Sequence, residues 1–85
     1  MPLYSVSYDL VKREEYESFW VELERLGATR YLRSHWAVRT PDHVTAQALG
    51  IHLRQFIDRN DSLFVIRLDE VEWAAFNTLL DLASL

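Results

Sequence analysis

The sequence predicts a single α+β domain in which a four-stranded antiparallel sheet carries two helices on one face. Residues 3–9 alternate between apolar and polar side chains with the period of two that is typical of a strand. Residues 12–26 place their apolar side chains on one stripe of a helix, and Gly27 follows as a left-handed cap. The later segments repeat the order of strand, helix and strand, which favours this class over an all-α or all-β fold.

The middle of the chain predicts two short strands and a second helix. Residues 29–40 contain β-branched and aromatic side chains without helical spacing, so we expect two strands that turn near Ser34 and His35. Residues 40–42 are threonine, proline and aspartate, which suit the cap, the first helical position and the positive end of a helix. We expect the second helix to begin there and to run to about Arg59.

The last third of the chain predicts one more strand and a C-terminal helix. The nearly continuous apolar run of residues 62–68 is typical of an interior strand that is covered on both faces. Asp69 with Glu72 forms a capping pattern that indicates a helix over residues 69–85. This helix is apolar almost all round and must dock on its own sheet or on another chain. The predicted order defines a ferredoxin-like βαββαβ core over residues 1–68 with a C-terminal helical tail, all in one domain.

Composition narrows the class of protein. The chain has 85 residues, 49% of them hydrophobic, with two glycines and two prolines, so it suits one small domain. A core of this size gives modest stability, and we expect a homodimer. The lack of cysteine excludes disulfides, a thiolate nucleophile and cysteine-ligated metals. The lack of cysteine also fits an intracellular compartment, and we expect a cytoplasmic protein. No apolar run approaches the length of a membrane span, so we expect no membrane segment.

Charge limits the binding partners. The formal net charge of -4 argues against nucleic-acid binding that is driven by total charge, although it allows a local basic patch. Arg30, Arg33 and Arg39 form such a patch, with Tyr31 and Trp36 between them. Arginine with aromatic surface is suited to contact the backbone and the bases of a nucleic acid. Alternatively, these arginines occupy the solvated side of an edge hairpin, where they discourage aggregation.

Asp9 is the candidate catalytic and metal-binding residue, because it is an ionisable group at the end of the first predicted strand. Carboxylate oxygens suit magnesium, which takes one or two protein carboxylates and fills its other positions with water and substrate phosphate. One aspartate supplies few ligands for a metal ion, but a homodimer axis near this strand would supply a second Asp9. The alternative is an aspartate that simply turns the chain into the first helix.

Three short motifs carry a resemblance to a known family. These are residues 6–9 (Val-Ser-Tyr-Asp), residues 34–36 (Ser-His-Trp) and residues 61–64 (Asp-Ser-Leu-Phe). The chain resembles the small CRISPR-associated adaptation proteins described as metal-dependent nucleases, together with the virulence-associated protein D ribonucleases and the SinR-type ferredoxin-like proteins. With the order of elements, the resemblance spans about residues 3–68.

The resemblance implies a site and partners. It implies a dimer in which Asp9 of each subunit lies near the two-fold axis and supports magnesium-dependent phosphodiester cleavage. Arginines near the start of the first helix often accompany the family's aspartate, and Lys12 and Arg13 stand in that region. Leu32 departs from the family, which often has glutamine there, and the predicted helical tail departs from the extra strand of many members.

Two hypotheses of function follow. In the first, the protein is an endoribonuclease or deoxyribonuclease in which a pair of Asp9 carboxylates binds magnesium and arginines hold the nucleic acid. In the second, it is a non-catalytic dimeric adaptor that binds nucleic acid or a protein, such as a CRISPR integrase component or an antitoxin partner. An Asp9→Ala variant would lose activity under the first hypothesis and would still bind under the second.

Overall fold

The computed structural model describes residues 1–12 and 16–85, and its fold is α+β with a four-stranded antiparallel sheet and two α-helices. In chain order the helices and strands are β1 (Leu3–Asp9), α1 (Glu17–Arg25), β2 (Thr29–Leu32), β3 (His35–Arg39), α2 (Ala46–Leu53) and β4 (Ser62–Arg67). Short 3₁₀ turns follow α2 and β4 and lie near the C-terminus: η1 (Arg54–Phe56), η2 (Leu68–Glu70) and η3 (Leu82–Ser84).

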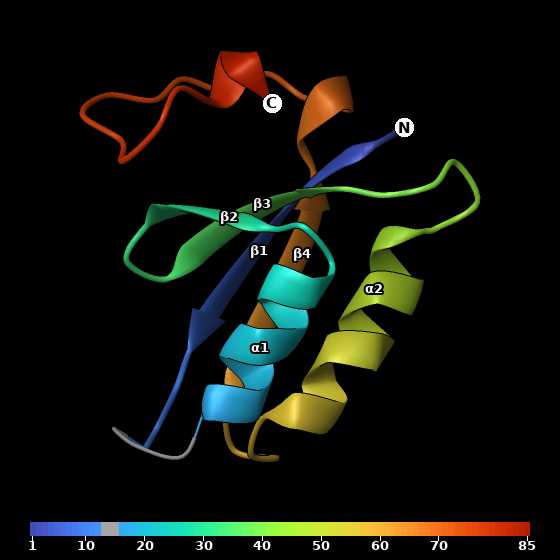
Figure 1. Ribbon diagram of the computed structural model, residues 1–85, viewed down its shortest axis with the longest axis vertical. Coiled ribbons are helices and arrows are strands. Elements are labelled where there is room, and N and C mark those ends of the chain that lie inside the picture. The colour runs from blue at the N-terminus through green and yellow to red at the C-terminus, as the bar shows by residue number, and fades with distance from the viewer. Residues whose placement is uncertain (13–15) are drawn as a thin grey trace.

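The sheet has the strand order β2-β3-β1-β4, and each neighbouring pair is antiparallel. β1 is therefore a central strand, and its Val6 lies opposite Trp36 of β3 on one side and Val65 of β4 on the other. The two helices run side by side along the sheet, and the chain after β4 folds across one end of the molecule (Figure 1).

The main core lies between the two helices and one face of the sheet. Val6 of β1, Phe19 and Leu23 of α1, and Leu53 of α2 are fully buried in it. Burying one side chain of this size stabilises the fold by about 1.5–3 kcal/mol. Tyr8, which the pattern of β1 predicts beneath the helices, packs against the edge of the same cluster. The period-two pattern of the first strand and the helical stripe of α1 were thus sufficient to identify the core faces.

The first helix agrees with its prediction in its centre and in its C-terminal end. α1 covers Glu17–Arg25 of the predicted stretch 12–26. Gly27 follows with a φ of 81°, the left-handed conformation expected of a glycine cap, and the N–H of Ala28 donates to the carbonyl of Leu23 at 2.9 Å.

The second helix begins later and ends earlier than predicted. α2 begins at Ala46, and the hydroxyl of Thr45 caps it by accepting from the N–H of Ala48 at 3.1 Å. The predicted start at Thr40 was wrong, because the N–H of Thr40 donates to the carbonyl of Pro2 at 3.1 Å and keeps the chain extended along the N-terminus. The predicted end at Arg59 was also wrong, since α2 ends at Leu53 and continues as η1.

β4 is an edge strand, so its prediction as an interior strand was wrong. It pairs with β1 on one side and stands last in the sheet order. Leu63 and Val65 pack against the main core, whereas Phe64 points to the opposite face and is 61% exposed. A continuous apolar run therefore marks a strand with apolar side chains on both faces, but it does not show that both faces are covered.

The predicted C-terminal helix over residues 69–85 is absent, and the segment is largely irregular between η2 and η3. Asp69 does not act as the predicted helix cap, because its carboxylate accepts from the N–H of Leu3 and from the guanidinium of Arg67. Asn77 has a φ of 57°, which interrupts any helical path. Tertiary contacts have overridden the local capping pattern. Among the described helices, none combines the length and the hydrophobicity that a membrane span requires.

The C-terminal segment instead covers part of the second sheet face. Its Leu82 is buried against Leu3, Tyr31, Ala37 and Leu68. The N–H of Leu79 donates to the carbonyl of Tyr31 at 3.0 Å. Of the two alternatives that the sequence left open for this segment, its own sheet or another chain, the structure shows contact with its own sheet, in a conformation that is not helical. The sheet face is covered near the start of β1 and open near its end.

Candidate functional site

Asp9 lies at the exposed end of β1, opposite Ser62 of β4. Because side chains alternate along a strand, the side chain of Asp9 points to the same sheet face as that of Ser7, which is the face opposite the two helices. Asp9, Ser62 and Phe64 contribute to the lining of a shallow hollow of about 210 Å³. The carboxylate makes no hydrogen bond or ion pair with another residue that the structure describes, so its oxygens are available to a ligand.

The uncovered part of this face, here called the open half-face, consists of Ser7, Asp9, His35, Ser62 and Phe64. Ser7 lies opposite His35 on one side and Phe64 on the other. The His35 Nδ1 atom is buried and has no hydrogen-bond partner within residues 1–12 and 16–85. The open half-face thus combines a free carboxylate, two hydroxyls, an unpartnered imidazole nitrogen and one large exposed apolar ring.

A cation site in one copy of the chain has few ligands. Within the described parts of the chain there is no group of three or more histidines and carboxylates that is arranged to hold a metal ion. Asp9 is a lone side chain in this respect. Magnesium accepts one or two protein carboxylates and retains water on its other positions. One copy therefore offers Asp9 as a single anchor, and a second anchor has to come from another molecule.

A network around Asp61 holds the chain that follows Asp9. The Asp61 carboxylate accepts from the N–H of Val11 at 2.7 Å, from the hydroxyl of Tyr16 at 2.9 Å and from the N–H of Asp58 at 2.7 Å. Burial raises the pKa of the Tyr16 hydroxyl, and the neighbouring Asp61 carboxylate adds to this effect. These bonds tie the segment after β1 to the start of β4, and they position the end of β1 where Asp9 lies.

Arg30 lies on the helix side of the sheet. It is opposite Trp36, and the ladder between β2 and β3 shifts register between Arg30 and Leu32. Its guanidinium carbon lies 5.3 Å from the ring centroid of Trp20 on α1 and 5.1 Å from that of Trp36. Cation–π attraction stabilises this arrangement. Of the two aromatic residues predicted beside the arginines, Trp36 contacts Arg30, whereas Tyr31 is buried on the opposite face of the sheet. Trp20 of α1 is an added member of the contact that was not predicted.

The other predicted arginines lie apart. Arg33 is exposed in the turn between β2 and β3, and its carbonyl accepts from the hydroxyl of Tyr8 at 3.2 Å. Arg39 lies at the far end of β3, where its guanidinium donates to the carbonyls of Met1 and Leu85 at 2.8 and 2.7 Å. Arg13 lies outside the described residues. The structure thus places Arg30 and Arg33 toward the turn of the β2–β3 hairpin and Arg39 at the far end of its second strand, in contact with both chain termini.

The sequence reasoning missed one ionic cluster between the two helices. Glu22 of α1 is buried, and its carboxylate accepts from the guanidinium of Arg25 and contacts the imidazole of His52 on α2. Arg25, with a further contribution from His52, lowers the pKa of Glu22 to about 2. The signal in the sequence was a glutamate within the apolar stripe, beside Leu23. This cluster joins α1 to α2 and is distant in the fold from the open half-face.

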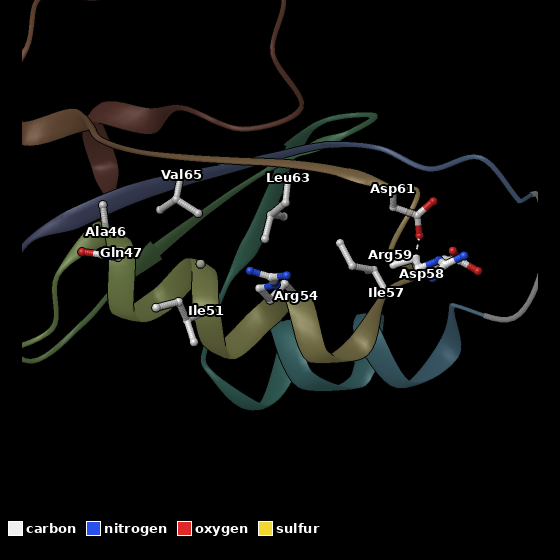
Figure 2. Close-up of a pocket in the computed structure, with 11 residues that line it drawn as sticks. Ala46, Gln47, Ile51, Arg54, Ile57, Asp58, Arg59, Asp61, Leu63 and Val65 are labelled. Carbon is white, nitrogen blue, oxygen red and sulfur yellow. Dashed lines mark hydrogen bonds between the residues drawn. The ribbon is translucent and has the colours of Figure 1, made fainter.

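A groove of about 600 Å³ runs between α2 and β4 (Figure 2). Leu63 and Val65 point from β4 toward the helix, and Arg54 and Ile57 point toward the strand. The charged residues Asp58, Arg59 and Asp61 lie at one end of the groove. The groove follows the free edge of the sheet, so its walls are an apolar strand face and a helix.

Together, these features define a small α+β protein with a four-stranded antiparallel sheet, two helices and a partly open sheet face. A comparison of the chain with models of known protein families found no match. The functional assignment therefore depends on the residues of the site and on the three short motifs.

Proposed function

We propose that the chain has a ferredoxin-like βαββαβ fold and forms a homodimer that cleaves phosphodiester bonds in RNA or DNA, with magnesium held by a pair of Asp9 carboxylates. The order of elements and the strand order β2-β3-β1-β4 support this fold. The resemblance of the motif that ends in Asp9 to those of metal-dependent nucleases supports this chemistry.

The observation that carries the proposal is the position of Asp9. It lies exposed on the open half-face, beside the exposed ring of Phe64. A sheet buries its apolar side chains against another layer, and a domain of this size gains stability from a second copy. A two-fold contact joins the same surface of both subunits. Association through the open half-face would therefore bring the two Asp9 carboxylates toward the axis.

The residues have distinct roles in this mechanism. Asp9 of each subunit supplies carboxylate oxygens, the ligand type that magnesium prefers, and these oxygens are free of other contacts within the described residues. A magnesium ion held by these carboxylates would supply polarisation of a phosphodiester and a bound water molecule of lowered pKa. Arg33 and Arg30 hold the flanking strand through their positive charge.

Asp9→Asn tests the proposal. The variant keeps the shape of the side chain and removes its charge, so we expect it to remain dimeric and to lose magnesium-dependent cleavage of labelled RNA and DNA substrates. Glu72→Gln is the matched control, because it makes the same change at an exposed position outside the open half-face. Full cleavage by Asp9→Asn would overturn the proposal.

The dimer surface has its own test. Phe64→Glu places a charge within the open half-face, and we expect a monomer without cleavage activity. Phe76→Glu is the control, because Phe76 is 84% exposed on the C-terminal segment and outside this surface. The oligomeric state is measured by light scattering after size-exclusion chromatography. A dimer that survives Phe64→Glu and dissociates in Phe76→Glu would contradict the proposed contact.

A second candidate function is that of a non-catalytic nucleic-acid-binding adaptor in CRISPR adaptation or in a toxin–antitoxin system. The observation that favours it is the exposed guanidinium of Arg30 over two indoles, which requires no metal. This function predicts equal binding by the native protein and Asp9→Asn in EDTA, and no cleavage by either protein with magnesium.

A further inference from the structure

A hollow of about 390 Å³ lies between α1 and the hairpin of β2 and β3, and Trp20, Glu24, Arg30 and Trp36 line it. The indoles of Trp20 and Trp36 are nearly parallel, with an interplanar angle of 16° and centroids 6.1 Å apart. The guanidinium of Arg30 lies over both rings. One wall of the hollow is therefore formed by the two indoles and the guanidinium over them. The carboxylate of Glu24 belongs to the same lining.

The wall is held in place by buried contacts. Trp36 is 7% exposed, and its indole N–H donates to the hydroxyl of Tyr8 at 2.9 Å. The ring of Tyr8 also packs against Trp20, with centroids 5.4 Å apart. Since both indoles are held by these contacts, the exposed guanidinium of Arg30 lies over rings of fixed position. Stacking on a fixed group costs a ligand less entropy than ordering a mobile side chain.

The two charged residues of the hollow do not pair with each other. Within the described part of the chain, neither the guanidinium of Arg30 nor the carboxylate of Glu24 makes a hydrogen bond or an ion pair, although the guanidinium lies over two indoles. A carboxylate accepts hydrogen bonds through two oxygens and donates none. The hollow thus combines a cationic stacking surface with a free pair of acceptors.

We propose that this hollow binds an unpaired base of a single-stranded nucleic acid and that it favours guanine. Every base can stack on the exposed guanidinium of Arg30, which lies over the indole of Trp20. Guanine also presents adjacent N1–H and N2–H donors, which match the two oxygens of Glu24. Thymine and uracil present only one donor, N3–H, and it lies between two carbonyl oxygens that the carboxylate repels. Glu24 is then the specificity-determining residue, and Arg30 supplies most of the stacking.

This inference takes its substrate class, a nucleic acid, from the proposed function. It adds the place on the protein where one base of that nucleic acid binds. Tyr8, which supports the hollow, directly precedes Asp9 in β1, and successive side chains of a strand point to opposite faces. The base site and Asp9 therefore lie on opposite faces near the same end of the sheet. Arg33 lies in the turn that Tyr8 contacts. It can therefore hold the phosphates of a nucleic-acid strand that passes from one face of the sheet to the other.

The test measures binding without cleavage. Labelled hexathymidylate and the same oligonucleotide with one central guanine are titrated in EDTA, with fluorescence anisotropy as the readout, and the RNA counterparts are measured in parallel. We expect the native protein to bind the guanine-containing strand about ten-fold more tightly, the scale of one good two-bond contact to a base. Glu24→Gln should bring the two affinities within about two-fold of each other, because it replaces one acceptor with a donor.

Matched variants separate the possible results. Glu17→Gln makes the same change on α1 outside the hollow and should preserve the guanine preference. Arg30→Lys keeps the charge and loses the plane, so it should weaken both oligonucleotides. Equal affinities for the native protein, an unchanged preference in Glu24→Gln, or no binding of either oligonucleotide would overturn the inference.

The result is distinguishable from failure of the proposed nuclease. Asp9→Asn should keep the guanine preference in EDTA, because Asp9 does not line the hollow. A guanine preference without any cleavage would leave the base site standing and would refute the nuclease. Cleavage that depends on Asp9, together with equal affinity for both oligonucleotides, would refute the base site and leave the nuclease standing.

Discussion

Trp36 donates its indole N–H to the hydroxyl of Tyr8 at 2.9 Å, and this bond joins the strand that ends in Asp9 to the indole beneath Arg30. The same hydroxyl donates to the carbonyl of Arg33 in the turn of the hairpin. One tyrosine thereby links the three positions to which the proposed function assigns a role.

The bond between Tyr8 and Trp36 predicts a measurable coupling. Tyr8→Phe leaves the indole N–H of Trp36 without its acceptor, so we expect a loss of about 1 kcal/mol in the free energy of unfolding. Urea unfolding of Tyr8→Phe, Trp36→Phe and the double variant gives the coupling energy. We expect about 0.5–1.5 kcal/mol. Strict additivity of the two single variants would show that the bond contributes nothing.

Glu22 predicts a dependence of stability on acid. Because its pKa is lowered from 4.5 to about 2 in the folded protein, its contribution is complete above pH 4.5 and is lost as the pH falls toward 2. Other carboxylates with lowered pKa values, such as Asp58, add to the acid sensitivity of the native protein. We therefore expect Glu22→Gln to lose less stability than the native protein over this interval. Parallel urea melts at the two ends of the interval measure the difference, and identical losses would refute it.

The hydrogen bonds of Asp61 predict a large loss of stability when this loop residue is replaced. Asp61→Ala removes one acceptor from two backbone N–H groups and from the hydroxyl of Tyr16, so we expect a loss of about 2 kcal/mol. Asp81→Ala is the comparison, because Asp81 caps the short turn η3 near the C-terminus and should cost about 1 kcal/mol or less. Chemical denaturation measures both values. Equal losses of stability would mean that the hydrogen bonds of Asp61 stabilise the fold no more than the cap at Asp81 does.

The two glycines predict opposite effects of the same substitution. Gly27→Ala should cost about 1 kcal/mol, because residue 27 adopts a φ of 81° that an L side chain disfavours. Gly50→Ala should stabilise the protein by up to about 1 kcal/mol, because residue 50 is inside α2 and a Cβ atom would meet Val65 at an ordinary 3.7 Å. Thermal melts of both variants test the pair. A destabilising Gly50→Ala would indicate that β4 lies closer to α2 than the structure places it.

The C-terminal segment predicts a contrast between two leucines. Leu82→Ala opens a cavity where the C-terminal segment packs on Leu3, Tyr31, Ala37 and Leu68, and it should cost about 2–3 kcal/mol. Leu79→Ala is the control, because the side chain of Leu79 is 68% exposed and its removal should change stability by less than about 0.5 kcal/mol. Urea unfolding measures both variants. If Leu82→Ala were as mild as the control, the segment would not be docked on the sheet in solution.

The candidate site was only partly predictable. Asp9 and Arg30 stand out in the sequence, one at the end of an alternating strand and the other among aromatic residues. Trp20 and Glu24 were not predicted as neighbours of Arg30, because the contact joins a helix to a hairpin. Arg39 was grouped with Arg30 by its place in the sequence, but the two lie on opposite faces of the sheet.

Local patterns in the sequence determined the strands, the centre of α1 and the cap at Gly27, because hydrophobic period and backbone freedom act over a few residues. Only the tertiary structure decided the start of α2, the edge position of β4 and the irregular path of the C-terminal segment. In each case the deciding contact joins distant parts of the chain, as Thr40 to Pro2 and Asp69 to Leu3 do. Such contacts outweigh local preferences of about 1 kcal/mol or less, and no local pattern records them.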